Sequence, residues 1–285
     1  MRQLSILFAT SEMAPWVKTG GLGDVAAALP AALHHAGHDI RVLLPAYPAL
    51  LAAFPAATVA AELPALAPAL PPARLLAAEA DGLPLLLLDC PPLYGRPGNP
   101  YLDAHGHDQV DNAIRFGLLS RVAALLGQPG SPLAWRPDVV HCNDWQTALA
   151  PAWLHYGGGA ASIVTVHNIA FQGNYAPGHC AALGLPDHAW SFDGVEYHGH
   201  LSFLKAGLQL ATQISTVSPT YAREIQDEHY GYGLAPLLRY RAGALRGILN
   251  GVDTALWNPA GDPALAAPYA ANRLAAKRAN KAALQ

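Results

Sequence analysis

Short runs of consecutive apolar residues alternate along this chain with longer segments whose apolar positions recur at helical spacing. Runs without a polar face are typical of strands covered on both sides, and such strands form parallel sheets with helices on each face. The pattern therefore predicts an α/β fold with a Rossmann-like, doubly wound parallel sheet. The predicted strands are residues 4–10, 39–45, 83–90, 138–142, 162–167 and 213–218, and the predicted helices are residues 21–37, 111–127, 201–211 and segments that begin near 145 and 218.

Two segments fit this alternation less well. Residues 46–80 are rich in Ala, Leu and Pro and have little periodicity, so they could form an irregular insertion or a hairpin, and no function is predicted for them. Residues 269–285 have a helical pattern that ends without the Gly or Pro of a usual stop signal. A helix that stops in mid-pattern suggests that the protein continues elsewhere.

The composition is that of a soluble globular protein. Of the 285 residues 52% are hydrophobic, and 17 basic residues stand against 20 acidic ones, which gives a formal charge of −3. Such a chain can bury a sizeable core, but no basic stripe stands out that would neutralise a phosphate backbone. We expect no nucleic-acid partner. We also expect no membrane association, because the apolar segments are well under the roughly 18 residues of a membrane span.

The N-terminal residues and the cysteines indicate in which cellular compartment the protein is expected. The N-terminal apolar run is short and lacks a convincing cleavage site, so it is interpreted as a first core strand. Cys90, Cys142 and Cys180 are odd in number and too far apart for metal-ligand pairs or a disulfide framework. This favours a reducing environment, and we expect a cytoplasmic protein.

The stretch "WVKTGGLGDV", residues 16–25, follows the first predicted strand and opens a helix. In doubly wound sheets, ligands bind beyond the carboxyl ends of the strands. Gly20 and Gly21 could let the backbone approach a ligand, and a helix N-terminus beside Lys18 favours an anionic group. The spacing fits neither the dinucleotide fingerprint nor the P-loop. The glycines could also serve only the turn, and Asp24 could be only a helix cap.

Other predicted strands also end in polar side chains. Because the carboxyl ends of parallel strands meet at one rim, these side chains could bind sugar hydroxyls, with Trp and Tyr covering the ring faces. The residues in question are Asn143, Asp144, Trp145, His167, Asn168, Asn250, Gly251 and Asp253.

Each candidate also has a plainer interpretation. Asp144 could cap the next helix, and His141, inside its strand, is expected to be a hydrogen-bonded core histidine. Lys205 is expected to extend from a helix face with its ammonium in solvent. For His167, which ends an apolar run at the ligand edge, a functional and a structural role are equally favoured.

Metal and serine chemistry lack their motifs. The chain has 13 histidines but no H-E-x-x-H and no C-x-x-C pair, and "YHGH" at residues 197–200 has a spacing that a loop adopts without an ion. We expect no metal site and no cofactor. The absence of G-x-S-x-G lowers the odds of a serine hydrolase.

Six segments in order resemble one family. They are "KTGGLGDV" after "ATSEM", "RPDVVHCNDWQTAL", "TVHNIAFQG", "SFLKAGL", "TVSPTYAREI" and "LNGVDTALWNP". This set resembles the bacterial glycogen synthases and plant starch synthases. The resemblance implies one half of a two-domain GT-B glycosyltransferase. It also implies retaining transfer of glucose from ADP-glucose to the non-reducing end of an α-1,4-glucan such as glycogen or a malto-oligosaccharide, without an essential metal.

The resemblance also implies roles for individual residues. Lys18, Gly20 and Gly21 would lie near the donor diphosphate. Asp24, His167 and Asn250 would surround the transferred glucose, with Lys18, Asp24 and His167 as the catalytic candidates. The residues expected to line the sugar and acceptor cleft are Tyr101, Asp144 and Asn168.

The resemblance divides the chain unevenly. Residues 1–260 would be the N-terminal catalytic domain, and residues 261–285 would begin the linker to a second Rossmann-like domain that this sequence lacks. In the family that second domain supplies the Arg and Lys that grip the diphosphate, so we expect the chain alone to be inactive. Two alternatives remain: a glucan-binding module without catalysis, and a transferase that uses UDP-glucose.

Overall fold

The computed structural model describes residues 2–103 and 105–285, and it divides into two compact units. The first unit contains the described residues up to Leu249, and the second is Asn250–Gln285. The sequence-based prediction placed the end of the first domain at residue 260. Each unit is described by itself.

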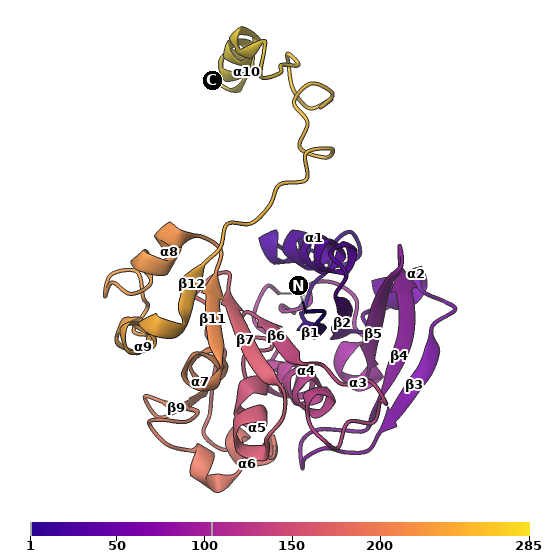
Figure 1. The fold of residues 1–285 in the computed structure, drawn as a ribbon, viewed down its shortest axis with the longest axis vertical. Helices are drawn as coiled ribbons and strands as arrows, with labels where there is room; N and C mark the ends of the chain where they lie inside the picture. Colours follow the sequence, from indigo (N-terminus) through magenta and orange to yellow (C-terminus); the bar gives the residue numbers. More distant parts are fainter. Residues whose placement is uncertain (1, 104) are drawn as a thin grey trace. The chain divides into compact units, whose positions relative to one another are not determined.

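The first unit is built on a nine-stranded sheet with the order β12-β11-β7-β6-β1-β2-β5-β4-β3 (Figure 1). Neighbouring strands from β12 to β5 are parallel, and β4 and β3 add an antiparallel edge. The predicted doubly wound parallel sheet is therefore confirmed. The strands are β1 (Ser5–Ala9), β2 (Asp39–Pro45), β3 (Thr58–Leu63), β4 (Ala73–Ala80), β5 (Leu83–Asp89), β6 (Val139–Asn143), β7 (Ala161–Val166), β11 (Gln213–Thr216) and β12 (Leu245–Gly247).

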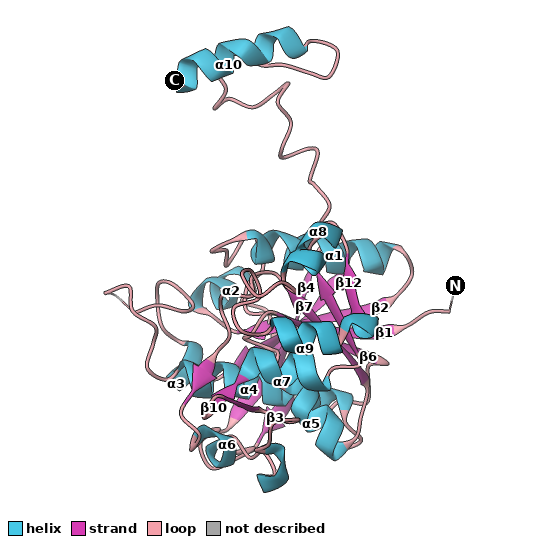
Figure 2. Cartoon of the chain, turned by 90° about the vertical axis from the view of Figure 1, so that its left-hand side faces the viewer, coloured by secondary structure: helices cyan, strands magenta, loops and turns pink. Residues whose placement is uncertain are grey.

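Helices cover both faces of this sheet. The connection from β1 through α1 to β2 crosses the sheet in one direction, and the connections through α4, α5 and α7 cross it in the opposite direction. Because such crossovers are right-handed, α1 lies on the opposite face of the sheet from α4, α5 and α7. Figure 2 shows these two layers. The helices of this unit are α1 (Gly21–His35), α2 (Pro48–Ala53), α3 (Pro91–Tyr94), α4 (Asn112–Gly127), α5 (Ala150–Gly157), α6 (His179–Ala182), α7 (Phe203–Leu210), α8 (Pro219–Glu224) and α9 (Ala235–Tyr240).

The segment 46–80 contains a β-hairpin. After α2, strand β3 pairs antiparallel with β4, with a bulge between Val59 and Ala61. Of the two possibilities that the sequence left open, the hairpin is the one observed. Because β4 also pairs with β5, this segment extends the sheet by two strands.

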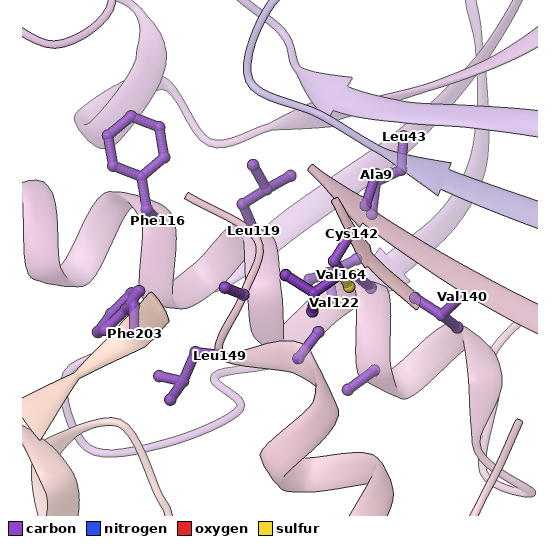
Figure 3. Close-up of a cluster of buried hydrophobic side chains, with 14 of the residues drawn as sticks. Ala9, Leu43, Phe116, Leu119, Val122, Val140, Cys142, Leu149, Val164 and Phe203 are labelled. Carbon is purple, nitrogen blue, oxygen red and sulfur yellow. The ribbon is translucent and has the colours of Figure 1, made fainter. Parts of the chain in front are cut away.

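Helix α4 forms the centre of the core. It is buried on almost every side, because it packs against the sheet and against helix α5. Phe116, Leu119 and Val122 of α4 belong to the same buried cluster as Val140 of β6 and Val164 of β7 (Figure 3). This packing places the ends of β6 and β7, and the loops that follow them, on a rigid base.

Two helices begin later than predicted. The helix expected from about residue 145 begins at Ala150, since residues 144–149 form turns in which Thr147 Oγ1 accepts from the N–H of Asn143 at 2.6 Å. The helix expected over 201–211 begins at Phe203, because residues His200–Ser202 form β10. Strand β10 lies between β8 (Asn174–Tyr175) and β9 (Glu196–Tyr197) in a small separate sheet.

The second unit, Asn250–Gln285, has little regular structure before its end. It contains one α-helix, α10 (Lys277–Leu284), which confirms part of the helical pattern predicted over 269–285. Lys277 places its ammonium nitrogen 5.6 Å from the centre of the Tyr269 ring. Within the described residues of the whole chain, no helix is both long enough and apolar enough to cross a membrane.

Candidate functional site

The order of strands reverses at β1. From β1 the chain moves to β2 and β5 on one side, and it returns through α4 to β6, β7, β11 and β12 on the other. In doubly wound folds such a reversal opens a crevice beyond the carboxyl ends of the two strands at the switch, and ligands bind there. The segments after β1, β6 and β7 are therefore where a site is expected.

The segment after β1 folds back on itself before α1 begins. Met13 and Val17 exchange two backbone hydrogen bonds of 2.9 and 3.0 Å, and the N–H of Ala14 donates to the carbonyl of Gly23 at 3.0 Å. The resulting tight turn is tied to the first turn of α1. It carries residues 18–20 past the end of β1.

Glu12 lies inside this turn and is 3% exposed. One of its carboxylate oxygens accepts from the N–H groups of Thr19, at 2.5 Å, and Gly20, at 3.4 Å. The other accepts from the hydroxyls of Thr19, at 2.6 Å, and Tyr101, at 2.5 Å. Glu12 was not among the predicted site residues, although an acidic residue directly after the first predicted strand is the signal that could have identified it.

The start of α1 has an open backbone. Gly20 is the N-cap and gives no side-chain cap, and neither Gly20 nor Gly21 has a positive φ. A Cβ at either position would meet no atom within 4 Å. At Gly23, by contrast, a Cβ would lie 3.1 Å from Cγ of Lys18. Packing thus accounts for Gly23, whereas the folded chain itself does not require glycine at positions 20 and 21.

Lys18 and Asp24 form an ion pair across this turn. Lys18 Nζ donates to Asp24 Oδ1 at 2.7 Å, and the two side chains are 40% and 46% exposed. Asp24 lies in the first turn of α1 rather than at its N-cap, so the capping role considered for it is wrong. The exposed pair adds little to stability. It does hold a lysine ammonium beside the open helix N-terminus.

Tyr101 donates to Glu12 from a loop that is held by a hydrogen bond from Arg115 to the carbonyl of Pro100. Arg115 is fully buried on α4 and donates to the carbonyls of Leu93, at 2.8 Å, and Pro100, at 2.7 Å, and to Asn112 Oδ1 at 2.8 Å. Burial, together with the charge of Glu12, raises the pKa of the Tyr101 hydroxyl well above its ordinary value. The phenol therefore stays protonated and donates its hydrogen bond to Glu12.

A second group of side chains lies at the ends of β6 and β7. Asp144 has a left-handed backbone, with φ +53°, and its carboxylate accepts from the N–H groups of His167, at 2.7 Å, and Asn168, at 3.3 Å. The alternative that Asp144 only caps the next helix is wrong. Asn143 donates from Nδ2 to the carbonyl of Ala9 in β1 at 3.0 Å, which links this group to the first one.

The bond from Asn143 to Ala9 also sets the state of His167. Because Nδ2 of Asn143 donates to Ala9, its Oδ1 must accept, and that oxygen lies 3.2 Å from Nε2 of His167. Burial lowers the pKa of His167 to about 4, so the ring is neutral at pH 7. The neutral ring carries its proton on Nε2 and keeps Nδ1 as an acceptor.

The carboxyl of Asp144 has a strongly shifted pKa. Burial raises the pKa of Asp144 to about 7, and the nearby charge of Glu12 acts in the same direction, while the N–H groups of His167 and Asn168 oppose the rise. Near neutral pH the Asp144 carboxyl is therefore close to half protonated. Such shifts concentrate at functional sites.

The side chains of His141 and Lys205 both make hydrogen bonds within the first unit. His141 was expected to be a hydrogen-bonded core histidine, and this is confirmed: its Nε2 lies 2.6 Å from Thr165 Oγ1, and its ring packs edge-on against Phe8 at 4.9 Å. Lys205 was expected to reach solvent, and this is wrong. It is 4% exposed, and its ammonium donates to the carbonyls of Phe192 and Gly194, so its role is to hold that loop on α7.

The structure thus brings most of the predicted site residues into two linked groups. Gly20 and Tyr101 donate hydrogen bonds to Glu12, and Lys18, Gly21 and Asp24 lie in the same turn and helix start. Asp144, His167 and Asn168 lie at the ends of β6 and β7. Asn250 is the first residue of the second unit, so the structure does not place it relative to these groups.

A pocket of about 440 Å³ opens beside Lys18. It combines the aromatic rings of Trp16 and Tyr47 with the polar side chains of Lys18, Thr19 and Arg96. Arg96 is itself held by an ion pair with Asp111. The residues that line the pocket are 16–19, 47–49 and 96–100. Over residues 2–103 and 105–285, no three His, Cys, Asp or Glu side chains come together as metal ligands would.

The fold and these contacts define a class: a doubly wound α/β domain with polar side chains gathered beyond the strand ends at the topological switch point. Within that class the chain belongs to the family described as starch synthase catalytic domain, which matches residues 5–240. It is 80% identical to the glycogen synthase of Dechloromonas aromatica over 285 residues, which is 100% of this chain and 59% of that protein. It is 54% identical to the glycogen synthase of Nitrosomonas europaea, covering 98% of this chain and 58% of that protein.

One solved structure is similar over nearly the whole chain. It is described as the catalytic domain of starch synthase IV from Arabidopsis thaliana bound to ADP and acarbose. The two are 30% identical with a TM-score of 0.77, over 99% of this chain and 59% of the other. The chain therefore spans less than two thirds of the length of the relatives that it matches.

Proposed function

We propose that this chain supplies the acceptor-side half of the active site of a glycogen synthase. The reaction is retaining transfer of glucose from ADP-glucose to the non-reducing end of an α-1,4-glucan. Family membership and the relatives named glycogen synthase support the proposal. The Arabidopsis structure, described as bound to ADP and acarbose, favours an adenine nucleotide donor over UDP-glucose.

The observation that carries the proposal is the open backbone at Gly20 and Gly21. At Gly21, inside the first turn of α1, alanine would be the more stable residue, since alanine loses less conformational entropy on folding. At Gly20, the N-cap, glycine is itself favoured over alanine. Here neither a positive φ nor a close neighbour requires glycine. Glycine at position 21 is explained if a ligand approaches the helix start, where backbone N–H groups and the helix dipole favour a diphosphate.

The chemistry of transfer fits the charges around this helix start. As the bond to the anomeric carbon breaks, positive charge grows on the sugar ring and negative charge grows on the departing ADP. The Lys18 ammonium and the first-turn N–H groups of α1 would stabilise the departing phosphate. To bind it, Lys18 must share or leave its ion pair with Asp24.

The sugar would lie between the two groups of side chains. His167 is neutral at pH 7, so it would act as a hydrogen-bonding group for a sugar hydroxyl and not as a cation. The pocket at residues 16–19, with its aromatic rings and polar side chains, would receive the glucan acceptor. Three buried, unpaired cysteines suit the proposed cytoplasmic location.

The test of this proposal is ADP binding by Gly21→Ala. We expect the 285-residue chain to bind ADP, and the Gly21→Ala variant to bind at least about fivefold more weakly without losing thermal stability. Gly243→Ala is the matched control, since Gly243 also has open space around it and no positive φ. Equal ADP affinity in the wild type and Gly21→Ala would contradict a diphosphate site at this helix start.

The alternatives are separated by two further assays. We expect the chain alone to transfer no glucose from radiolabelled ADP-glucose to glycogen, because in this family the second domain grips the diphosphate. Incorporation of label would refute that expectation. Competition between ADP and UDP distinguishes a UDP-glucose enzyme, and glucan affinity without any nucleotide affinity would favour a non-catalytic glucan-binding module.

A further inference from the structure

Glu12 presents a physical problem at the proposed diphosphate site. A carboxylate in the same turn as an anion-binding helix start repels the ligand, and the repulsion is strong where burial limits screening. Even so, the side chain of Glu12 is buried and accepts hydrogen bonds from the backbone N–H groups of Thr19 and Gly20. If its only effect were its charge, the site would bind better without it.

The hydrogen bonds of Glu12 give it a different effect. Its two oxygens take four donors: two backbone N–H groups and the hydroxyls of Thr19 and Tyr101. The hydroxyl of Ser11 lies 2.8 Å from that of Tyr101 and continues the network. Since Tyr101 is 89 residues away in sequence, this one carboxylate fixes the turn against a distant loop.

The same bonds decide which N–H groups remain available. The amides of Thr19 and Gly20 point to Glu12 and are not available to a ligand. The next three amides, those of Gly21, Leu22 and Gly23, lie in the first turn of α1 and have no intrahelical acceptor. The turn and side-chain hydrogen bonds between described residues do not use them either.

We propose that Glu12 is a positioning residue for the donor diphosphate. By holding the Thr19 and Gly20 amides and the Tyr101 hydroxyl, its carboxylate fixes the turn so that the amides of Gly21, Leu22 and Gly23 face the ligand. This inference rests on the proposed function. It assigns the diphosphate contacts to residues 21–23, with the amide of Gly20 turned away.

Charge and positioning predict opposite signs for the variant Glu12→Gln. The substitution removes a negative charge but keeps the size of the side chain. If charge were decisive, the variant would bind ADP more tightly. If positioning is decisive, it binds more weakly, because a glutamine can accept at only one atom and its NH₂ group faces donors. We expect ADP affinity to fall on the order of tenfold or more.

The experiment is an ADP titration of the isotope-labelled 285-residue chain, followed through its backbone amide NMR signals. In the wild type, ADP should shift the amides of residues 21–23 and leave those of Thr19 and Gly20 nearly unmoved. In Glu12→Gln, the latter two amides should exchange faster with solvent and respond to ADP. Glu62→Gln, an exposed acid on β3, is the control for loss of charge and should bind as the wild type does.

The possible outcomes separate this inference from the proposed function. If ADP shifts no amide of the wild type, the diphosphate site proposed at this helix start is wrong and this inference falls with it. If the wild type binds ADP but Glu12→Gln binds equally well or more tightly, the inference alone is overturned. If Glu12→Gln fails to fold, Thr19→Val is the second variant, because it removes only the hydroxyl donor of Thr19 from the four donors to Glu12. We expect it to lose about two- to fivefold in ADP affinity. An unchanged affinity overturns the inference.

Discussion

Replacing Asp144 by asparagine should make the chain more stable at neutral and alkaline pH. Burial raises the pKa of Asp144 to about 7 from an ordinary value of 3.8. Between these two values the folded state keeps a proton that the unfolded state has lost. The stability that this proton contributes is fully present below pH 3.8 and is lost as pH rises through 7. Asparagine accepts the same two N–H groups and has no charge to bury.

The size of the effect follows from the width of this interval. From pH 5 to pH 7 the wild type binds about one proton more in the folded than in the unfolded state. Two pH units at 1.36 kcal/mol each give about 2.7 kcal/mol. The free energy of unfolding of Asp144→Asn should therefore rise by about 2 to 3 kcal/mol relative to the wild type between pH 5 and pH 7, and the difference should level off above pH 7.

Urea denaturation followed by circular dichroism at several pH values measures this difference. The buried histidines titrate in both proteins and cancel in the comparison. Asp81→Asn is the matched control, because Asp81 also has a left-handed backbone, with φ +50°, but is exposed in the turn between β4 and β5. A difference between wild type and Asp144→Asn that stays constant from pH 5 to pH 8 would refute the reasoning.

Three further variants test the packing that supports the site. Arg115→Met should lower the free energy of unfolding, measured by urea denaturation, by about 3 to 5 kcal/mol, because it leaves the buried carbonyls of Leu93 and Pro100 without donors. Arg223→Met, at an exposed position, is the control and should lower it by under about 0.5 kcal/mol. Lys205→Met should cost about 2 to 4 kcal/mol by the same mechanism, and a stabilised variant would contradict it. Gly127→Ala should lower the free energy of unfolding by about 1 to 3 kcal/mol and so lower the melting temperature, since a Cβ there would lie 2.9 Å from Val140 Cγ2. An unchanged melting temperature would show that the neighbouring side chains move aside without cost.

The elements predicted correctly are those whose signal is local. Strands β1, β2, β5, β6 and β7 are short apolar runs, and burial on both faces in a parallel sheet demands such runs. The rule that ligands bind beyond the strand ends selected Lys18, Asp144 and His167 as candidates without any knowledge of their contacts, and their roles remain predictions. The hairpin of β3 and β4 was left open, because its connection lacks the usual two-residue turn signal.

The elements missed depend on distant partners. Lys205 has the pattern of a helix-face lysine, and only the irregular loop that carries Phe192 and Gly194 turns it into a buried donor. The network of Glu12 joins residues up to 89 positions apart, and a sequence gives no sign of such a pairing. The unexpected pKa of Asp144 likewise arises from burial that exists only after β6 and β7 are aligned.

These two carboxylates together predict that ligand binding takes up a proton. The charge of Glu12 already raises the pKa of Asp144, so the two groups of the site are electrostatically coupled. A bound diphosphate at Lys18 would add more negative charge to the same region and raise the pKa of Asp144 further. Near pH 7 that shift requires net proton uptake on ADP binding.

Calorimetric titration of ADP in buffers with different heats of ionisation measures this proton uptake. The phosphate of ADP titrates in the same range, so the decisive quantity is the difference between the wild type and Asp144→Asn. We expect the wild type to take up a larger fraction of a proton than the variant at pH 7.5, with the difference vanishing at pH 5, where Asp144 is already protonated. Equal uptake by the two proteins at pH 7.5 would mean that the diphosphate and Asp144 are too far apart to interact, and the proposed placement of the donor beside Lys18 would have to be revised.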